Sequence, residues 1–137
     1  MTNSLVLDSA ALDSLAGTRT AEQTAVRAAL RATIRLNRKV LVPAVVLAEL
    51  YRGPRHNQVV DACLARETGI KVRDTDRALA RLVGGVLSAA KAGSEDMADA
   101  HVVACAVETG GGVVVTGDPD DLGRLSATYP NVLVTEI

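Results

Sequence analysis

The chain has 137 residues, with 15 lysines and arginines against 16 aspartates and glutamates, which gives a formal net charge of −1. This length fits one domain over residues 1–137. The balanced charge argues against broad, charge-driven binding to nucleic acid, although a local basic face remains compatible with it. Tyr51 and Tyr129 are the only aromatic residues, which excludes a base-stacking platform for single strands.

The two cysteines, Cys63 and Cys105, are far apart and form no CxxC motif. We interpret them as buried free thiols in a reducing cytosol. A zinc site that combines them with His56 and His101 is the alternative, but the spacing is not that of a zinc finger. The apolar stretch Val40–Leu50 is too short to cross a bilayer, and we see no targeting segment. We therefore expect a cytoplasmic protein without a membrane partner.

Apolar runs alternate with segments of helical period along the chain. The runs predict strands at residues 4–7, 40–42, 70–72, 113–116 and 132–134. Helices are expected at about 20–37, 44–52, 58–67, 75–90 and 95–109, with a short helical turn at 120–125. Asp74 or Thr75 is the expected cap of the helix that ends near residue 90, and Ser94 is the expected cap of the next one.

Two of the predicted helices carry distinctive residues. In the first helix an apolar face is formed by Val26, Leu30, Thr33 and Ile34, and the other face carries Arg27, Arg31, Arg35 and Arg38. We interpret the arginines as a solvated face, with RNA contact as the alternative. In the helix 75–90 the inward residues are Leu79, Leu82, Val83, Val86 and Leu87. Gly84-Gly85 in its middle are expected to mark a kink or a close packing contact.

This alternation indicates an α/β fold in three layers, α/β/α, around a five-stranded, mostly parallel sheet covered on both faces. The pattern restricts the strand order without determining it; the order 3-2-1-4-5 would make the first and fourth strands neighbours. Ligands of doubly wound sheets bind beyond the carboxyl ends of the strands, at the switch point. Asp8 directly follows the first strand, and Asp118 follows the fourth after one glycine. That order would bring both acids to the switch point.

Four acids stand at the borders of apolar segments or inside them: Asp8, Glu49, Asp99 and Asp118. Acidic side chains are rarely buried unless they are paired or bind a cation. Each has an ordinary reading as a turn residue, an exposed helix position or a helix-start acid. Their joint occurrence in one α/β pattern favours a shared site.

Carboxylates that share a pocket repel one another, and a divalent cation removes this repulsion. Ligation by oxygen alone suits Mg²⁺ or Mn²⁺ rather than zinc. Such an ion polarises a phosphate oxygen and activates water. The acids therefore predict hydrolysis of phosphodiester bonds.

Four segments resemble PIN-domain nucleases, in particular VapC-type toxins of type II toxin–antitoxin systems. They are Leu5–Ser9, Val45–Leu50, Asp99–Ala106 and Val114–Leu122, and the resemblance extends over essentially the whole chain. It implies an Mg²⁺-dependent endoribonuclease in which Asp8, Glu49, Asp99 and Asp118 hold the metal. It also implies an RNA substrate such as transfer or ribosomal RNA, a cognate antitoxin that plugs the cleft, and a homodimer. The alternative is a non-catalytic PIN-fold module for protein association.

Several other residues are candidates for supporting roles. The resemblance implies that the hydroxyl groups of Ser9 and Thr116 orient the acids. Asp96 and Asp121 are reserve ligands, although a helix-start role is favoured for Asp96. Arg52, Arg55 and His56 follow the second acid and are candidate phosphate contacts, which would position RNA without reading its sequence.

Overall fold

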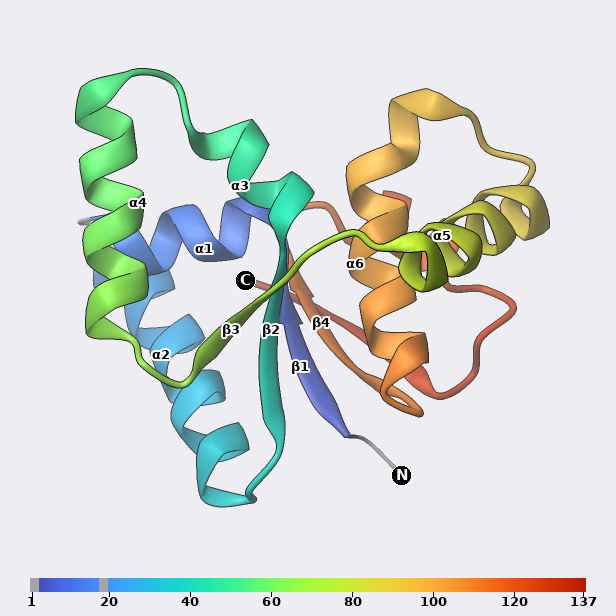
Figure 1. Cartoon of the computed structure of the whole chain (residues 1–137). Helices are drawn as coiled ribbons and strands as arrows, with labels where there is room; N and C mark the ends of the chain where they lie inside the picture. The colour runs from blue at the N-terminus through green and yellow to red at the C-terminus, as the bar shows by residue number, and fades with distance from the viewer. Residues whose placement is uncertain (1–2, 18–19) are drawn as a thin grey trace.

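The computed structural model describes residues 3–17 and 20–137 (Figure 1). Its strands are β1 (Ser4–Leu7), β2 (Lys39–Pro43), β3 (Ile70–Arg73), β4 (Gly112–Thr116) and β5 (Val132–Glu136). They form one sheet in the order β3-β2-β1-β4-β5, and every neighbouring pair is parallel. The strand order expected from the sequence is confirmed. The sheet that we expected to be mostly parallel is parallel in all its pairs.

Helices cover both faces of this sheet, so the three-layer architecture is confirmed as well. One face carries α1 (Ser9–Ala16), α2 (Thr20–Arg35) and α4 (Pro54–Arg66), and the other carries α5 (Arg77–Ala90), α6 (Met97–Glu108) and α7 (Pro119–Leu125) (Figure 1). The short helix α3 (Ala44–Leu50) follows β2 directly and touches α1, α4 and α6. It therefore bridges the two helical layers at the carboxyl edge of the sheet.

The core consists of small and aliphatic side chains, as the composition requires. Val6, Leu7, Val42 and Val114 are fully buried in the sheet, and the residues from Ala100 to Ala106 of α6 are all buried. An apolar strand buried on both faces and a helix apolar all round belong in the interior of an α/β protein. The sheet and α6 thus form the rigid base for the residues at their ends.

Both cysteines are free and buried, as predicted. Burial raises the pKa of the Cys105 thiol to about 12, so this thiol stays protonated at neutral pH. Nδ1 of His101 pairs with the carbonyl oxygen of Met97 at 2.7 Å. Within the described ranges, the only grouping able to hold a metal consists of aspartates. The zinc alternative therefore finds no support.

Helix α1 is absent from the sequence-based expectation. Asp8 is its N-cap, with Oδ1 accepting a hydrogen bond from the backbone N–H of Ala11 at 2.9 Å. Ala11, Leu12 and Leu15 are buried, which is the spacing of an amphipathic helix. We predicted Asp8 to follow a strand and to bind metal, and did not predict that it also begins a helix.

Other local expectations need correction. Asp76 caps α5 through a hydrogen bond from Leu79, so neither Asp74 nor Thr75 does. A 3₁₀ turn, Ser94–Asp96, precedes α6, and the Ser94 side chain is not a cap. α5 runs through Gly84 and Gly85 without a break, and a Cβ on either glycine would meet no atom within 4 Å. The close-packing interpretation of these glycines is therefore wrong.

In α2 the arginine face is exposed as predicted for most of its length, but the apolar face ends early. Val26 and Leu30 are buried, whereas Ile34 is 44% exposed. Within the portion of the chain that the structure describes, no helix has the length and apolar character needed to span a membrane.

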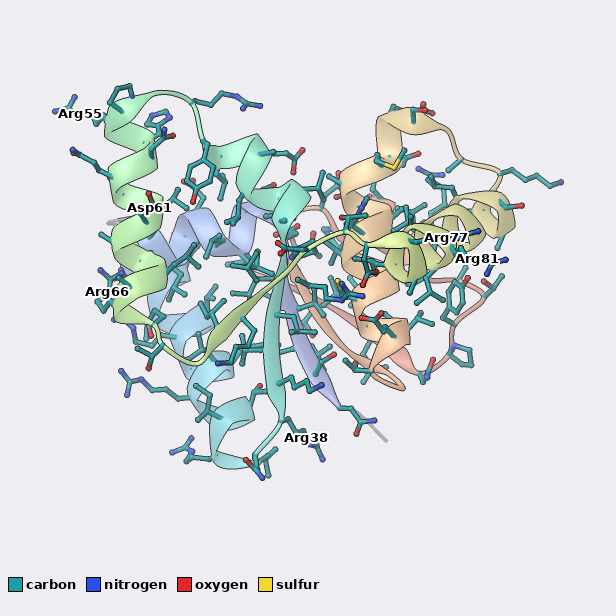
Figure 2. All side chains as sticks on the ribbon, in the orientation of Figure 1. Arg38, Arg55, Asp61, Arg66, Arg77 and Arg81 are labelled. Atoms are coloured by element: carbon teal, nitrogen blue, oxygen red, sulfur yellow. The ribbon has the colours of Figure 1, made fainter. Side chains whose placement is uncertain are left out.

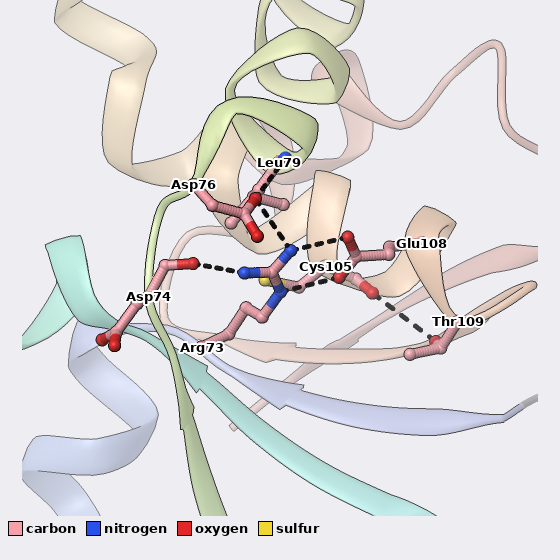
Figure 3. A network of polar contacts seen from close by, with 7 residues as sticks. All are labelled: Arg73, Asp74, Asp76, Leu79, Cys105, Glu108 and Thr109. Atoms are coloured by element: carbon pink, nitrogen blue, oxygen red, sulfur yellow. Dashed lines mark hydrogen bonds and ion pairs between the residues drawn. The ribbon is translucent and has the colours of Figure 1, made fainter.

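An arginine at the end of β3 fixes α5 against α6 (Figure 3). Nε and Nη2 of Arg73 each donate to one carboxylate oxygen of Glu108 at 2.8 Å, and Nη2 also lies 3.2 Å from Oδ1 of Asp76, the α5 cap. The fork geometry of the guanidinium suits such bidentate pairing. The Arg73–Glu108–Asp76 network thus joins β3, α5 and α6.

Candidate metal centre

Asp8 occupies the switch point between β1 and β4. Its side chain is 5% exposed, with Oδ1 bonded to the Ala11 amide and Oδ2 accepting from the Gly117 amide at 3.3 Å. The backbone N–H of Asp8 donates to Val115 of β4 at 3.2 Å. Two amides from separate elements therefore fix the orientation of this carboxylate.

Asp99 is partly buried in the first turn of α6. The pKa of its carboxyl is raised from 3.8 to about 6, first by burial and then by the negative charges of nearby acids, which are, in order of effect, Asp8, Glu49, Asp121 and Asp118. Repulsion of this kind acts between like charges that lie close together. The charges of the other three acids predicted from the sequence therefore act on Asp99, and the assignment of all four to one metal site stays a prediction.

Glu49 and Asp118 complete this group from exposed positions. Glu49 lies near the end of α3, and Asp118 is the N-cap of α7, where Oδ1 accepts from the Asp121 amide at 3.3 Å. The buried hydroxyl of Thr116 accepts from the Asp118 amide at 2.8 Å, so it orients the backbone at this acid. Among the described residues, no hydrogen bond joins the Ser9 hydroxyl to an acid; the amides of Ala11 and Gly117 bond to Asp8 instead.

The two reserve acids lie beside Asp99. One carboxylate oxygen each of Asp96, Asp99 and Asp121 lies within 4.8 Å of the others. Arg124 faces this trio, with Nη2 at 3.1 Å from Asp96 and 3.7 Å from Asp121. Asp96 stands at the start of α6, as the helix-start role that we favoured requires, but its side chain makes no cap hydrogen bond there. A hydrogen bond with Asp118 raises the pKa of Asp121.

Two of the three candidate phosphate contacts lie next to Glu49. A pocket of about 250 Å³ is lined by Glu49, Arg52 and His56, and by Asp13 of α1. Nη1 of Arg52 donates to the carbonyl oxygens of Ala48 and Tyr51 at 2.6 and 3.0 Å, so it also closes the end of α3. We missed Asp13 because we missed α1.

Arg55 does not line this pocket. It lies at the outer end of α4 and points away from α3 and α6 (Figure 2). Its place beside Arg52 in the sequence therefore does not bring it to the acids.

The chemistry of the converging side chains fits a hard divalent cation. All the donors are carboxylate oxygens, which Mg²⁺ and Mn²⁺ prefer. Burial and then the charges of neighbouring acids raise the pKa of Asp99, and a cation would remove the repulsion among these charges. Among the described residues, Asp96, Asp99 and Asp121 bring carboxylate oxygens close enough to hold such an ion, while Asp8, Glu49 and Asp118 add negative charge that acts on Asp99.

Solved structures share this fold at low sequence identity. One is VapBC2 from Rickettsia felis bound to a DNA fragment from their promoter, with a TM-score of 0.65, 14% identity, and coverage of 97% of this chain and 98% of that one. Another is a toxin–antitoxin complex from Klebsiella pneumoniae, with a TM-score of 0.65, 17% identity, and coverage of 97% and 99%. No curated protein matches the sequence significantly. The PIN domain model matches residues 5–127. Since this match spans most of the chain, the protein belongs to the PIN domain family.

Proposed function

We propose that this protein is a metal-dependent endoribonuclease and the toxin of a toxin–antitoxin pair. The observation that carries the nuclease proposal is the acidic cluster, in which carboxylate oxygens of Asp96, Asp99 and Asp121 lie within 4.8 Å of one another beside the charges of further acids. Membership of the PIN domain family supports the same activity. The toxin role is supported by the two structural neighbours, which are described as a VapBC complex and a toxin–antitoxin complex.

The fixed carboxylates define how the site would work. Asp8 is held by two amides and cannot turn away from the edge of the sheet, and Asp99 faces it from α6. Without a cation this cluster would repel an RNA phosphate, so activity should depend strictly on Mg²⁺ or Mn²⁺. When bound, the cation would polarise a phosphate oxygen and lower the pKa of a bound water. The role of this chain is to hold the acids close together before the cation binds.

Arg52 and His56 are placed to position the substrate. They share a pocket with Glu49, so a phosphate held there would lie beside the acids. Guanidinium groups bind phosphate through paired N–H donors. We therefore assign these two residues to RNA positioning and leave Arg55 out of the set.

The remaining parts of the proposal concern partners and setting. A cognate antitoxin is proposed as the protein partner. The homodimer and the cytoplasmic location stay predictions from the sequence. Co-purification from the native host tests the antitoxin, which should be found as a protein bound to this chain.

Cleavage of RNA by purified protein tests the nuclease. We expect cleavage with Mg²⁺, none with excess EDTA, and a loss of at least about 100-fold in Asp8→Asn and Asp99→Asn. Asp74→Asn is the matched control, because Asp74 is exposed and is not among the charges that act on Asp99. Circular dichroism checks that each variant folds.

Two results would contradict the proposal. Cleavage that continues in EDTA would show that the activity does not need a metal held by the acids. Absence of cleavage in every variant, including wild type on transfer and ribosomal RNA, would favour the alternative of a non-catalytic PIN-fold module that associates with proteins.

A further inference from the structure

A second feature, remote from the acids, is a basic groove between α2 and the end of α4. We call it the arginine groove and define it by Leu30, Arg31, Ile34, Arg35, Arg66 and Gly69. Its volume is about 420 Å³. Through Arg31 it continues along α2 into a second depression, which Arg27 also lines.

The groove has apolar walls and cationic rims. A Cβ on Gly69 would collide with the side chain of Ile34, so the absence of a side chain at Gly69 lets Ile34 lie across the floor. Ile34 therefore lies against Gly69 although it is 44% exposed. The arginines that line the groove come from both α2 and α4.

Positive charge in the groove exceeds negative charge. Glu67 is the one carboxylate lining it, and it lies 3.5 Å from Arg27 and 3.7 Å from Arg66. Glu67 therefore ties α2 to α4 and is already compensated. Arg31 and Arg35 have no carboxylate within 4 Å among residues 3–17 and 20–137, and both are exposed. Nε of Arg27 is buried without a hydrogen-bond partner.

The spacing of these arginines suits a polyanionic strand. Arg27, Arg31 and Arg35 are four residues apart, so their stems are about 6 Å apart along one side of α2. Neighbouring phosphates of a nucleic-acid strand have a comparable spacing. Each guanidinium presents a fork of donors that matches a phosphate. The lack of aromatic residues on this surface excludes base stacking, so contact would be with the backbone.

The groove and the acids lie at opposite ends of the sheet. The acids lie at the carboxyl ends of β1 and β4, whereas the groove adjoins Gly69, just before β3 begins at Ile70. One strand length, roughly 15 Å, separates these two edges. Only an RNA larger than a few nucleotides would reach both.

We propose that the arginine groove is a phosphate-binding surface that holds the backbone of a structured RNA while another part of it lies at the acids. This inference rests on the proposed ribonuclease function. It assigns Arg31 and Arg35 to affinity for large substrates and leaves the chemistry at the acids unchanged.

Binding to an uncleaved RNA tests the groove independently of catalysis. The protein carries Asp8→Asn and is kept in EDTA, and the anisotropy of a labelled RNA hairpin is titrated at several salt concentrations. The double variant Arg31→Ala/Arg35→Ala should bind on the order of tenfold more weakly. Its slope of log K against log salt should be smaller by about 1.5, because each phosphate contact contributes about 0.7–0.9.

The matched control is Arg77→Ala/Arg81→Ala. These two arginines have the same spacing on α5, are exposed, and lie on the other side of the molecule from Arg66 (Figure 2). The control removes the same net charge. Its affinity for the RNA and its slope of log K against log salt should stay close to those of the protein that carries Asp8→Asn alone. Equal losses in the two double variants would indicate a general charge effect and overturn the proposal.

A labelled poly-glutamate peptide distinguishes an acidic protein segment from RNA. If the α2 variant loses peptide binding while RNA binding is unchanged, the groove receives protein and the RNA proposal is wrong. With Mg²⁺ and an intact Asp8, the α2 variant should show a raised KM and an unchanged kcat on a hairpin RNA. It should show neither change on an RNA too short to reach the groove. If wild-type protein cleaves nothing, the proposed function fails, while the binding titration still decides the groove.

Discussion

The backbone amide of Gly117 donates a hydrogen bond to Oδ2 of Asp8 at 3.3 Å and so joins the ends of β4 and β1. The approach is close: a Cβ on Gly117 would lie 2.7 Å from the Cβ of Ala10 in α1. Such a distance forces one of the backbones to move. Gly117 therefore keeps α1, β4 and the Asp8 carboxylate in one arrangement.

Gly117→Ala should disturb this arrangement. We expect the free energy of unfolding to fall by about 1–3 kcal/mol, the usual cost of overpacking, and RNA cleavage to fall more than about tenfold because Asp8 shifts. Urea unfolding and initial rates of cleavage measure the two effects. Gly85→Ala is the control, since a Cβ there meets no atom within 4 Å in the middle of α5. It should raise stability by about 0.5–1 kcal/mol; a similar loss there would refute the packing argument.

Asp99 makes the metal-free protein sensitive to pH. Burial and the neighbouring acids raise the pKa of this carboxyl to about 6 in the folded state, above its value in the unfolded chain. Protonation therefore favours folding: the contribution is fully present below pH 4 and is lost as the pH rises through 6. It amounts to about 2–3 kcal/mol. In EDTA at pH 8, Asp99→Asn should be more stable than wild type, and at pH 5 this advantage should shrink.

Denaturant unfolding of both proteins at pH 8 and pH 5 measures the difference in stability between Asp99→Asn and wild type. The other titrating groups are the same in both proteins, so their contributions cancel in this difference. Saturating Mg²⁺ should stabilise wild type and stabilise Asp99→Asn much less. An advantage of the variant that does not change with pH would show that the repulsion at Asp99 is not what the substitution relieves.

The sheet could be predicted from the sequence because its strands are buried runs of valine and leucine bounded by glycine and charge. Position along the chain also placed Asp8 and Asp118, since residues after parallel strands share an edge. The same reasoning missed α1, because one aspartate both ends β1 and caps the next helix. The apolar pattern before Asp8 indicates where the strand ends, but the cap of a following helix leaves no separate signal when the same residue fills both positions.

Pairings between distant side chains were beyond sequence reasoning. The contact of Arg124 with Asp96 joins residues 28 positions apart and depends on how α7 packs against α6. Arg55 shows the converse, because it is adjacent to useful residues in sequence but points elsewhere in space. Successive residues of a helix point in directions about 100° apart. Which of them faces the acids therefore depends on how the helix is oriented in the fold.

Arg124 pairs with two members of the aspartate trio, so its removal should change the affinity for divalent ions. Its side chain is 46% exposed, so the loss of its ion pairs in Arg124→Ala should change the stability little. Removing this positive charge should strengthen Mg²⁺ binding several-fold, as expected for about 1 kcal/mol of repulsion in water. Calorimetric titration measures the affinity. Arg124→Lys keeps the charge and should bind Mg²⁺ like wild type. If Arg124→Ala and Arg124→Lys bind Mg²⁺ with equal affinity, the ion does not bind near Arg124.

Arg73 provides a test of how α5 is fixed to α6. The pair with Glu108 is bidentate, at 2.8 Å for both bonds, and the side chains are only 22% and 29% exposed. Arg73→Lys keeps the charge but loses the fork, and should cost about 1–2 kcal/mol in urea unfolding. Arg77→Lys, four residues further along the chain and exposed, should cost nothing measurable.

The pH dependence of the stability lost in Arg73→Lys shows whether Arg73 acts through its ion pair or through packing. Hydrogen bonding with Arg73 lowers the pKa of the Glu108 carboxyl, so the stability from this pair is present above the ordinary pKa of a glutamate and is lost as the pH falls through the lowered value. The cost of Arg73→Lys should therefore shrink in acid, and in a Glu108→Gln background it should be smaller at every pH. A cost that is unchanged by both acid and Glu108→Gln would mean that Arg73 acts through its aliphatic stem, and that the bidentate pair does not hold α5 in place.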